Sequence, residues 1–186
     1  MKRLGVVILF VFLTLKLMSQ NPGGDTIIWS SDYKLSATDF QNRKKSNGRL
    51  AAATSCQILT TYYYSQDSIT LCVYAIFLKK RSYLIAPYFS DRLLKHEQVH
   101  FDITELYSRK LREKVSRMSF NDSFNRFKFN KIRNRYVNSC SRFQKKYDRR
   151  TEHGLLIKRQ RKLEQSIERK LIKLQKFHNP CLVRLP

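Results

Sequence analysis

Two histidines and a glutamate in one short stretch have the spacing of a metal site. Residues 93–110 read LLKHEQVHFDITELYSRK, so His96 and His100 lie four positions apart and Glu97 directly follows the first. On an α-helix the two imidazoles stand about 40° apart, one turn above the other, where both can reach one ion. Glu97 lies about 100° round from His96, too far to be a third ligand but near enough to take a proton from a water on that ion. This pattern predicts a zinc site with Glu97 as general base.

The neighbours of the histidines favour a site inside the fold. Apolar side chains share the helix face of the two histidines: Leu93, Ile103, Tyr107 and Leu111. Two core histidines satisfied by hydrogen bonds are the alternative, but a buried pair without partners would be costly, so metal binding is favoured. Asp102 and Glu105 point away from this face, and Glu105 has Arg109 one turn on as an ion-pair partner.

A catalytic zinc takes three protein ligands and keeps a fourth position open, so one ligand must come from elsewhere in the chain. His153, in the stretch YDRRTEHG (147–154) between two predicted helices, is favoured because imidazole is the commonest metal ligand. Asp148 and Glu152 are the carboxylate alternatives. Tyr147 and Arg149 are candidates to support negative charge in a transition state.

The elements that position these residues are read from periodicity. The β-branched and aromatic runs 51–64 and 68–78, joined by the turn-like SQDS (65–68), predict a β-hairpin. A helix is predicted over 91–117, capped by Ser90 or Asp91. Two more helices follow, with apolar stripes at Ile132, Tyr136, Cys140, Phe143 and Tyr147, and at Leu156, Leu163, Ile167, Leu171 and Leu174. The fold class is α+β: a small N-terminal β-hairpin or sheet, then three long helices, the first a zincin-like active-site helix.

The beginning of the chain reads as a targeting segment. Lys2 and Arg3 precede a twelve-residue apolar run, LGVVILFVFLTL, and small Ser19 follows it. This predicts a signal peptide over 1–20, with a retained anchor as the alternative. A single domain over 21–178 and a loop-like C-terminal tail over 179–186 complete the expected organisation. No other stretch could span a bilayer, so we expect an exported protein: periplasmic, outer-membrane-associated or extracellular.

Export would allow the four cysteines to form disulfides. Cys56 and Cys72 lie on β-like runs, Cys140 on a helical stripe and Cys181 near the end of the chain, and no CxxC spacing is present. Four cysteines allow three full pairings, between which the sequence does not choose. A buried free thiol and a disulfide are equal alternatives for Cys140.

The charge is concentrated in the second half of the chain. Residues 21–108 carry ten Lys/Arg against eight Asp/Glu, and residues 109–186 carry twenty-four against six. A surface of this kind attracts anionic lipid headgroups, nucleic acid or acidic substrates, or is simply solvated, which is the favoured interpretation. Nucleic acid is disfavoured because an exported protein rarely meets it.

Three stretches resemble a known family: AAATS (51–55), LLKHEQVHFDITELYSRKL (93–111) and YDRRTEHG (147–154). They are similar to an uncharacterised bacterial domain family catalogued as predicted secreted zinc-dependent proteases, over a region from about Trp29 to about Leu171. The family pattern Tyr-Asp-x-x-Thr-x-His-Gly matches Tyr147, Asp148, Thr151, His153 and Gly154. The resemblance therefore implies His153 as a site residue.

These observations favour an exported zinc metallopeptidase that acts on a peptide or protein substrate. The alternative is a non-catalytic basic envelope protein that binds anionic surfaces or nucleic acid through its helices. A zinc site kept only for structure is a third interpretation, and Glu97 argues against it because a structural site needs no base.

Overall fold

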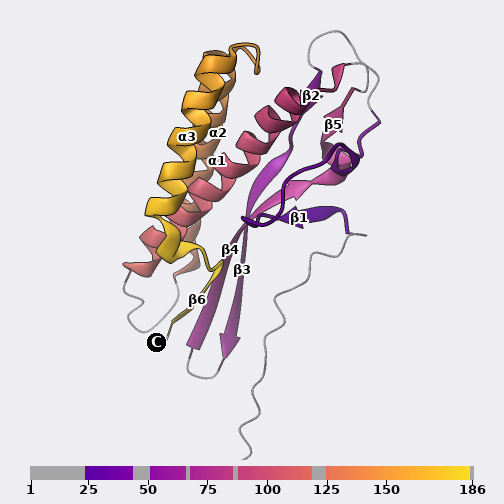
Figure 1. The fold of residues 1–186 in the computed structure, drawn as a ribbon. Coiled ribbons are helices and arrows are strands. Elements are labelled where there is room, and N and C mark those ends of the chain that lie inside the picture. The colour runs from indigo at the N-terminus through magenta and orange to yellow at the C-terminus, as the bar shows by residue number, and fades with distance from the viewer. Residues whose placement is uncertain (1–23, 44–50, 66–67, 86–87, 119–124, 185–186) are drawn as a thin grey trace, which may run out of the picture.

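The computed structural model describes residues 24–43, 51–65, 68–85, 88–118 and 125–184 (Figure 1). The predicted signal peptide (1–20) and the centre of the predicted turn (66–67) lie outside these ranges. The strands are β1 (Thr26–Ile28), β2 (Ala52–Ala53), β3 (Cys56–Ser65), β4 (Ser68–Leu78), β5 (Tyr83–Leu84) and β6 (Cys181–Arg184). The helices are α1 (Asp91–Ser116), α2 (Arg126–Thr151) and α3 (Ile157–Lys173), with short 3₁₀ turns at Ala37–Asp39, Lys79–Arg81 and Gln175–Phe177.

An antiparallel sheet is built around the long strand β4. The hairpin of β3 and β4 pairs from Cys56 opposite Phe77 to Ser65 opposite Ser68, which confirms the predicted hairpin. On the other side of β4, β1 pairs with its end and β6 with its beginning, and both are antiparallel to it. Strands β2 and β5 form a separate two-stranded sheet.

The three helices lie together on one side of the main sheet (Figure 1). Helix α1 contacts β3 and β4 as well as α2, α3 and the 3₁₀ turn after α3. It begins where predicted, because the Ser90 side chain accepts a hydrogen bond from the Leu93 amide at 3.2 Å and so caps the helix. Because α1 is covered from several directions, polar side chains on it are buried as well as apolar ones. This central helix carries both histidines.

The helical stripes confirm the predicted core faces. Buried members of the main core include residues from each helix: Val99, Ile103, Leu106, Leu111 and Val115 of α1, Phe129, Cys140 and Tyr147 of α2, and Ile167 and Leu171 of α3. Partly buried members pack against them, among them Ile132, Tyr136, Phe143, Leu163 and Leu174. The α+β class with three helices after the sheet is therefore confirmed.

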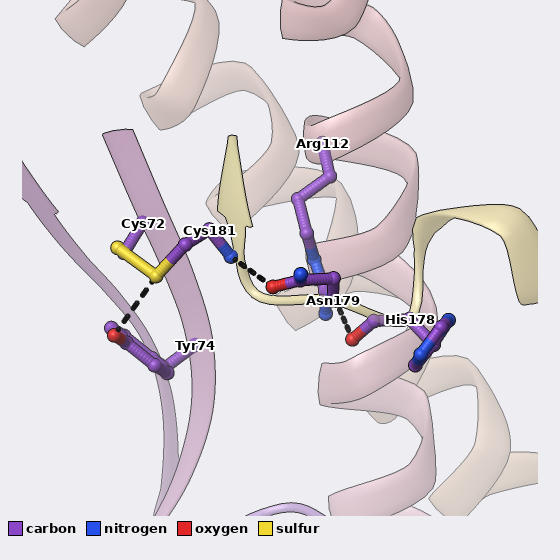
Figure 2. Close-up of a disulfide and its surroundings, with 6 residues drawn as sticks. All are labelled: Cys72, Tyr74, Arg112, His178, Asn179 and Cys181. Carbon is purple, nitrogen blue, oxygen red and sulfur yellow. Dashed lines mark hydrogen bonds between the residues drawn. A yellow bond between two sulfur atoms is a disulfide. The ribbon is translucent and has the colours of Figure 1, made fainter. Parts of the chain in front are cut away.

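The C-terminal segment differs from the expected loop. Residues 181–184 form β6, which is tied to β4 by a disulfide between Cys72 and Cys181 (Figure 2). A four-residue run after a proline carries little periodicity, so the strand is created by its partner and its crosslink. Cys56 and Cys140 are free, and Cys140 is buried. No helix among the described residues is long and apolar enough to cross a membrane.

Candidate metal site

Two imidazoles and one carboxylate converge between α1 and α2. Asp148 Oδ1 lies 2.8 Å from His100 Nε2 and 3.2 Å from His96 Nε2. One potential ligand atom from each of the three residues falls within 4.8 Å of the others. Both histidines are almost completely buried, whereas a quarter of the Asp148 side chain remains exposed. The cluster is therefore accessible from one side only.

The donor set fits a zinc ion. Imidazole nitrogen and carboxylate oxygen are ligands that zinc accepts, and two ligand atoms at bonding distance from a tetrahedral ion lie about 3.3 Å apart. The two nitrogen-to-oxygen distances, 2.8 and 3.2 Å, need to grow by only a few tenths of an ångström to meet that value. Among the described residues the cluster holds three such groups, which leaves a fourth position for a substrate or a water.

A hydrogen-bond chain defines the tautomer of His100. The Thr104 hydroxyl donates its only proton to the His100 carbonyl oxygen at 3.0 Å, so its oxygen must accept from the Gln144 amide nitrogen, 3.2 Å away. That orientation turns Gln144 Oε1 toward His100 Nδ1 at 3.1 Å, and Nδ1 must then carry a hydrogen. The nitrogen that faces Asp148 is thus Nε2. In the neutral imidazole, Nε2 carries no hydrogen and its lone pair is available to bind a metal ion.

His96 is held by packing instead. Its ring stacks on Tyr147, with centroids 4.7 Å apart and planes inclined by 20°. On another side Gly154 approaches closely, since a Cβ built there would lie 3.2 Å from His96 Cγ. His96 Nδ1 is buried and has no hydrogen-bond partner among the described residues, a situation that costs about 1–3 kcal/mol.

The electrostatics of the cluster couple the carboxylate to both imidazoles. Burial opposes the charged form of His100, but the hydrogen bond with Asp148 and the nearby Glu97 carboxylate outweigh it and raise its pKa. Burial likewise acts to raise the pKa of Asp148, yet the hydrogen bonds with His100 and His96 hold it well below its usual range. Without a metal, the cluster is therefore an ionised carboxylate shared by two imidazoles.

Glu97 is buried beside this cluster and is not one of its three ligands. Its negative charge acts on both His100 and Tyr147, which places it near the two rings. The structure gives it no hydrogen bond or ion pair to a described residue. An ionisable side chain kept next to the ligands and left unpartnered suits a group that exchanges protons.

Asp148, not the favoured His153, stands at the third position. Asp148 lies one helical turn after Gln144 on α2, on the face turned toward α1. Glu152 and His153 follow the helix in left-handed backbone conformations, with φ of 49° and 52°, and both side chains are exposed. This reversal of the chain directs them into solvent, so the structure does not bring either of them to the cluster.

The two candidates for transition-state support differ in position. Tyr147 is 1% exposed and lies against both imidazoles, with a 5.2 Å edge contact to His100 in addition to the stack on His96. Its hydroxyl has no partner among the described residues. Burial and the surrounding carboxylates raise its pKa, so the phenol stays protonated. Arg149, the next residue, is exposed. Of the two, only Tyr147 contacts the imidazole rings of the cluster.

Sequence reasoning missed Gln144, Thr104 and the packing role of Gly154. The spacing of Gln144 gave a weak signal, because this residue lies four positions before Asp148 and so shares its helix face. Thr104 likewise follows His100 by four residues. Neither spacing reveals that the two faces meet, which depends on how α1 and α2 pack.

Comparison with known proteins places the cluster in a recognised segment. No curated protein and no solved structure matches the chain. The family described as "Bacterial protein of unknown function (DUF922)" matches residues 87–154, a shorter region than the one expected from Trp29 to Leu171. The matched segment contains α1, α2 and all three cluster residues, so this part of the chain is a domain similar to that bacterial family.

Proposed function

We propose that this protein is a zinc-dependent metallopeptidase, in which His96, His100 and Asp148 hold the ion and Glu97 is the general base. The observation that carries the proposal is the convergence of both Nε2 atoms on one Asp148 oxygen, next to a buried glutamate that has no hydrogen bond or ion pair to a described residue. The match to a family without assigned activity is compatible with this function and does not supply it.

Each residue of the site would have a separate role in peptide hydrolysis. A zinc ion in this site would polarise a peptide carbonyl and lower the pKa of a water from about 15.7 to about 7. Glu97 would accept the proton of the attacking water and deliver it to the amine nitrogen that leaves. Gln144 and Thr104 would keep His100 in the tautomer that presents Nε2, and Tyr147 would hold the plane of His96.

We also propose that the protein works outside the cytoplasm. The disulfide between Cys72 and Cys181 supports this, because such bonds persist in oxidising compartments and are rare in the cytosol. The apolar run after Lys2 and Arg3 supports it from the sequence side.

The first experiment measures bound metal and peptide cleavage in parallel variants. Asp148→Asn should lose zinc, whereas His153→Ala and Glu152→Gln should retain it, because their side chains point into solvent. Retention of zinc by Asp148→Asn together with its loss in His153→Ala would refute the assignment of the third ligand.

The second experiment separates catalysis from metal binding. Glu97→Gln should keep zinc but lower kcat for a cleaved peptide by about 10²-fold or more, as expected for loss of a general base. Glu113→Gln is the matched control, since this residue lies on the same helix and pairs with Arg117 at the surface. Cleavage by Glu97→Gln at the rate of the parent would overturn the catalytic assignment and leave a structural zinc site.

A further inference from the structure

The hairpin of α2 and α3 presents a cationic surface that acidic residues in the described part of the chain do not neutralise. Between Arg126 and Lys176 there are 18 Lys/Arg and four Asp/Glu. Nearly all of these cations are exposed, and none forms an ion pair with an acidic residue in the described part of the chain. Positive charges gathered at this density repel one another, and an external anionic surface would relieve that repulsion.

The turn that joins these two helices adds exposed aliphatic side chains. Leu155 is 64% and Ile157 51% exposed. Cations stand on both sides in sequence, with Arg149 and Arg150 before the turn and Lys158 after it, all exposed. Aliphatic residues surrounded by lysine and arginine are the composition of segments that lie in the interface of anionic membranes.

We propose that the turn 152–157 docks this protein onto an anionic lipid bilayer. Leu155 and Ile157 would enter the boundary between headgroups and acyl chains, and the flanking cations would contact lipid phosphates. Nucleic acid fits less well, because unpaired bases are bound mainly by stacking on Phe, Tyr or Trp rings, and this turn has none of these and only the imidazole of His153. The Cys72–Cys181 disulfide also favours a compartment where membranes are the abundant polyanion.

Docking of this turn would bring the metal site to the membrane. Gly154 lies inside the turn and against the ring of His96, and Figure 1 shows the turn at the same end of the helical layer as the beginning of α1. If the site is a peptidase centre, which rests on the proposed function, its substrates would be peptide bonds close to the bilayer surface. Membrane binding itself does not depend on catalysis and can be tested without it.

The experiment uses the full chain after export, with its N-terminus identified by mass spectrometry. It measures the partition of this protein onto vesicles of phosphatidylglycerol or of phosphatidylcholine. We expect binding to phosphatidylglycerol only, with a steep loss as salt rises. Leu155→Ser/Ile157→Ser should weaken partition by about tenfold or more. Phe127→Ser is the matched control: this residue is 81% exposed between Arg126 and Lys128, at the other end of a 26-residue helix.

Several results would overturn the proposal. Equal binding to both lipids, unchanged partition of the double serine variant, or an equal loss in Phe127→Ser would each do so. Tighter binding to duplex DNA than to vesicles, with no effect of the serine substitutions, would identify a nucleic-acid surface instead. Hydrogen–deuterium exchange adds a local readout, because vesicles of phosphatidylglycerol should protect 152–157 even if another segment also binds lipid.

A second inference comes from two unpaired atoms beside Gly154. His96 Nδ1 and Gln160 Oε1 are both buried without a hydrogen-bond partner among the described residues. A Cβ built on Gly154 would lie 3.2 Å from His96 Cγ and 3.3 Å from Gln160 Oε1, so both side chains border the same point. When His96 binds a metal through Nε2, its Nδ1 carries a hydrogen and needs an acceptor, and the unpaired Gln160 Oε1 lies close to the same point beside Gly154.

We infer that Gln160 is the positioning residue for His96, as Gln144 is for His100. Its amide nitrogen points to the Arg92 carbonyl oxygen at 3.4 Å, which leaves Oε1 as the free atom. Rotation of the Gln160 side chain toward His96 would let Oε1 accept from Nδ1–H and keep Nε2 directed at Asp148. This inference rests on the metal site of the proposed function.

Zinc affinity and the tautomer of His96, read by nitrogen NMR, test this role. Gln160→Leu should bind zinc about 10–100-fold more weakly and mix the His96 tautomers, whereas Gln160→Glu should restore both. Gln165→Leu, at an exposed glutamine of the same helix, is the control. An unchanged affinity in Gln160→Leu would overturn the inference, whereas a parent protein without zinc affinity would refute the proposed function itself.

Discussion

At the scale of single residues, the site depends on how closely the chain after α2 can approach α1. Gly154 has φ of +89°, a conformation that residues with a Cβ rarely adopt, and a Cβ built on it would lie only 3.2 Å from His96 Cγ. Its backbone amide also donates to Thr151 Oγ1 at 3.3 Å. A glycine here therefore serves both the turn and the packing of the His96 imidazole.

Gly154→Ala should lower the free energy of unfolding by about 1–3 kcal/mol and weaken zinc binding, because the new methyl group strains the backbone and displaces His96. Thermal denaturation and chelator competition measure the two effects. His153→Ala is the control, since this preceding residue has a similar left-handed φ of 52° but an exposed side chain that does not border His96. Equal changes in the free energy of unfolding and in zinc affinity for both variants would show that the close approach of Gly154 to His96 contributes to neither.

Protons should compete with zinc at His100. Because its pKa is raised in the metal-free protein, zinc must displace a proton from this imidazole, and the affinity should fall about tenfold for each pH unit below that pKa. Calorimetry in buffers of different ionisation enthalpy would count the released proton. An affinity that stays constant between about pH 5 and 7 would contradict this coupling.

At the scale of elements, a buried charge cluster joins α1 to the end of α3. Glu105 pairs with Arg109 at 2.8 Å and with Arg112 at 2.7 Å, and the pair with Arg109 confirms the prediction from their spacing. The arginines donate onward to the Leu171, Phe177 and His178 carbonyl oxygens. Figure 2 shows Arg112 beside the segment that leads to Cys181. The cluster thus supplies side-chain donors to carbonyl groups at the end of α3 and in the segment that follows it, where few backbone amides remain to do so.

Glu105→Gln should lower the free energy of unfolding by about 3–5 kcal/mol, because it leaves two buried guanidinium groups without their counter-charge. Glu113→Gln repeats the same substitution on the same helix in an exposed pair with Arg117, where a change within about 0.5 kcal/mol is expected. Urea denaturation of both variants gives the comparison. Equal changes in the free energy of unfolding for the two variants would show that burial of the Glu105 cluster does not increase its contribution to stability.

At the scale of the whole molecule, one crosslink ties the end of the chain to the centre of the sheet. Cys72 and Cys181 are 109 residues apart in sequence, so the disulfide closes a loop that contains all three helices. Backbone pairing of β6 with β4 and the hydrogen bond between the Cys181 amide and Asn179 Oδ1 hold the same segment (Figure 2). In the sequence, all three helices therefore belong to a loop that is closed by the covalently joined strands β4 and β6.

Cys72→Ala/Cys181→Ala should lower the free energy of unfolding by about 4–5 kcal/mol, the value expected from chain entropy for a loop of this length. Reductant should destabilise the parent protein by a similar amount and leave the double variant unchanged. Thiol alkylation under denaturing, non-reducing conditions should modify Cys56 and Cys140 only. Modification of all four cysteines would rule out the crosslink in the purified protein.

The local features of this protein were readable from its sequence. The helix that carries His96 and His100, the hairpin around SQDS and the apolar stripes through Cys140 and Ile167 all follow from periodicity and caps, which act over a few residues. The pairing of two imidazoles on one helix face belongs to this class, because the 3.6-residue repeat alone imposes it.

Contacts between distant segments were decided only by the tertiary structure. Asp148 in place of His153 at the third position depends on which face of α2 packs on α1, and on a left-handed turn that sends His153 outward. The Cys72–Cys181 pairing and the strand β6 require that the chain end return to β4. Such choices are set by long-range packing, whose energy is distributed over many side chains and leaves no short pattern in the sequence.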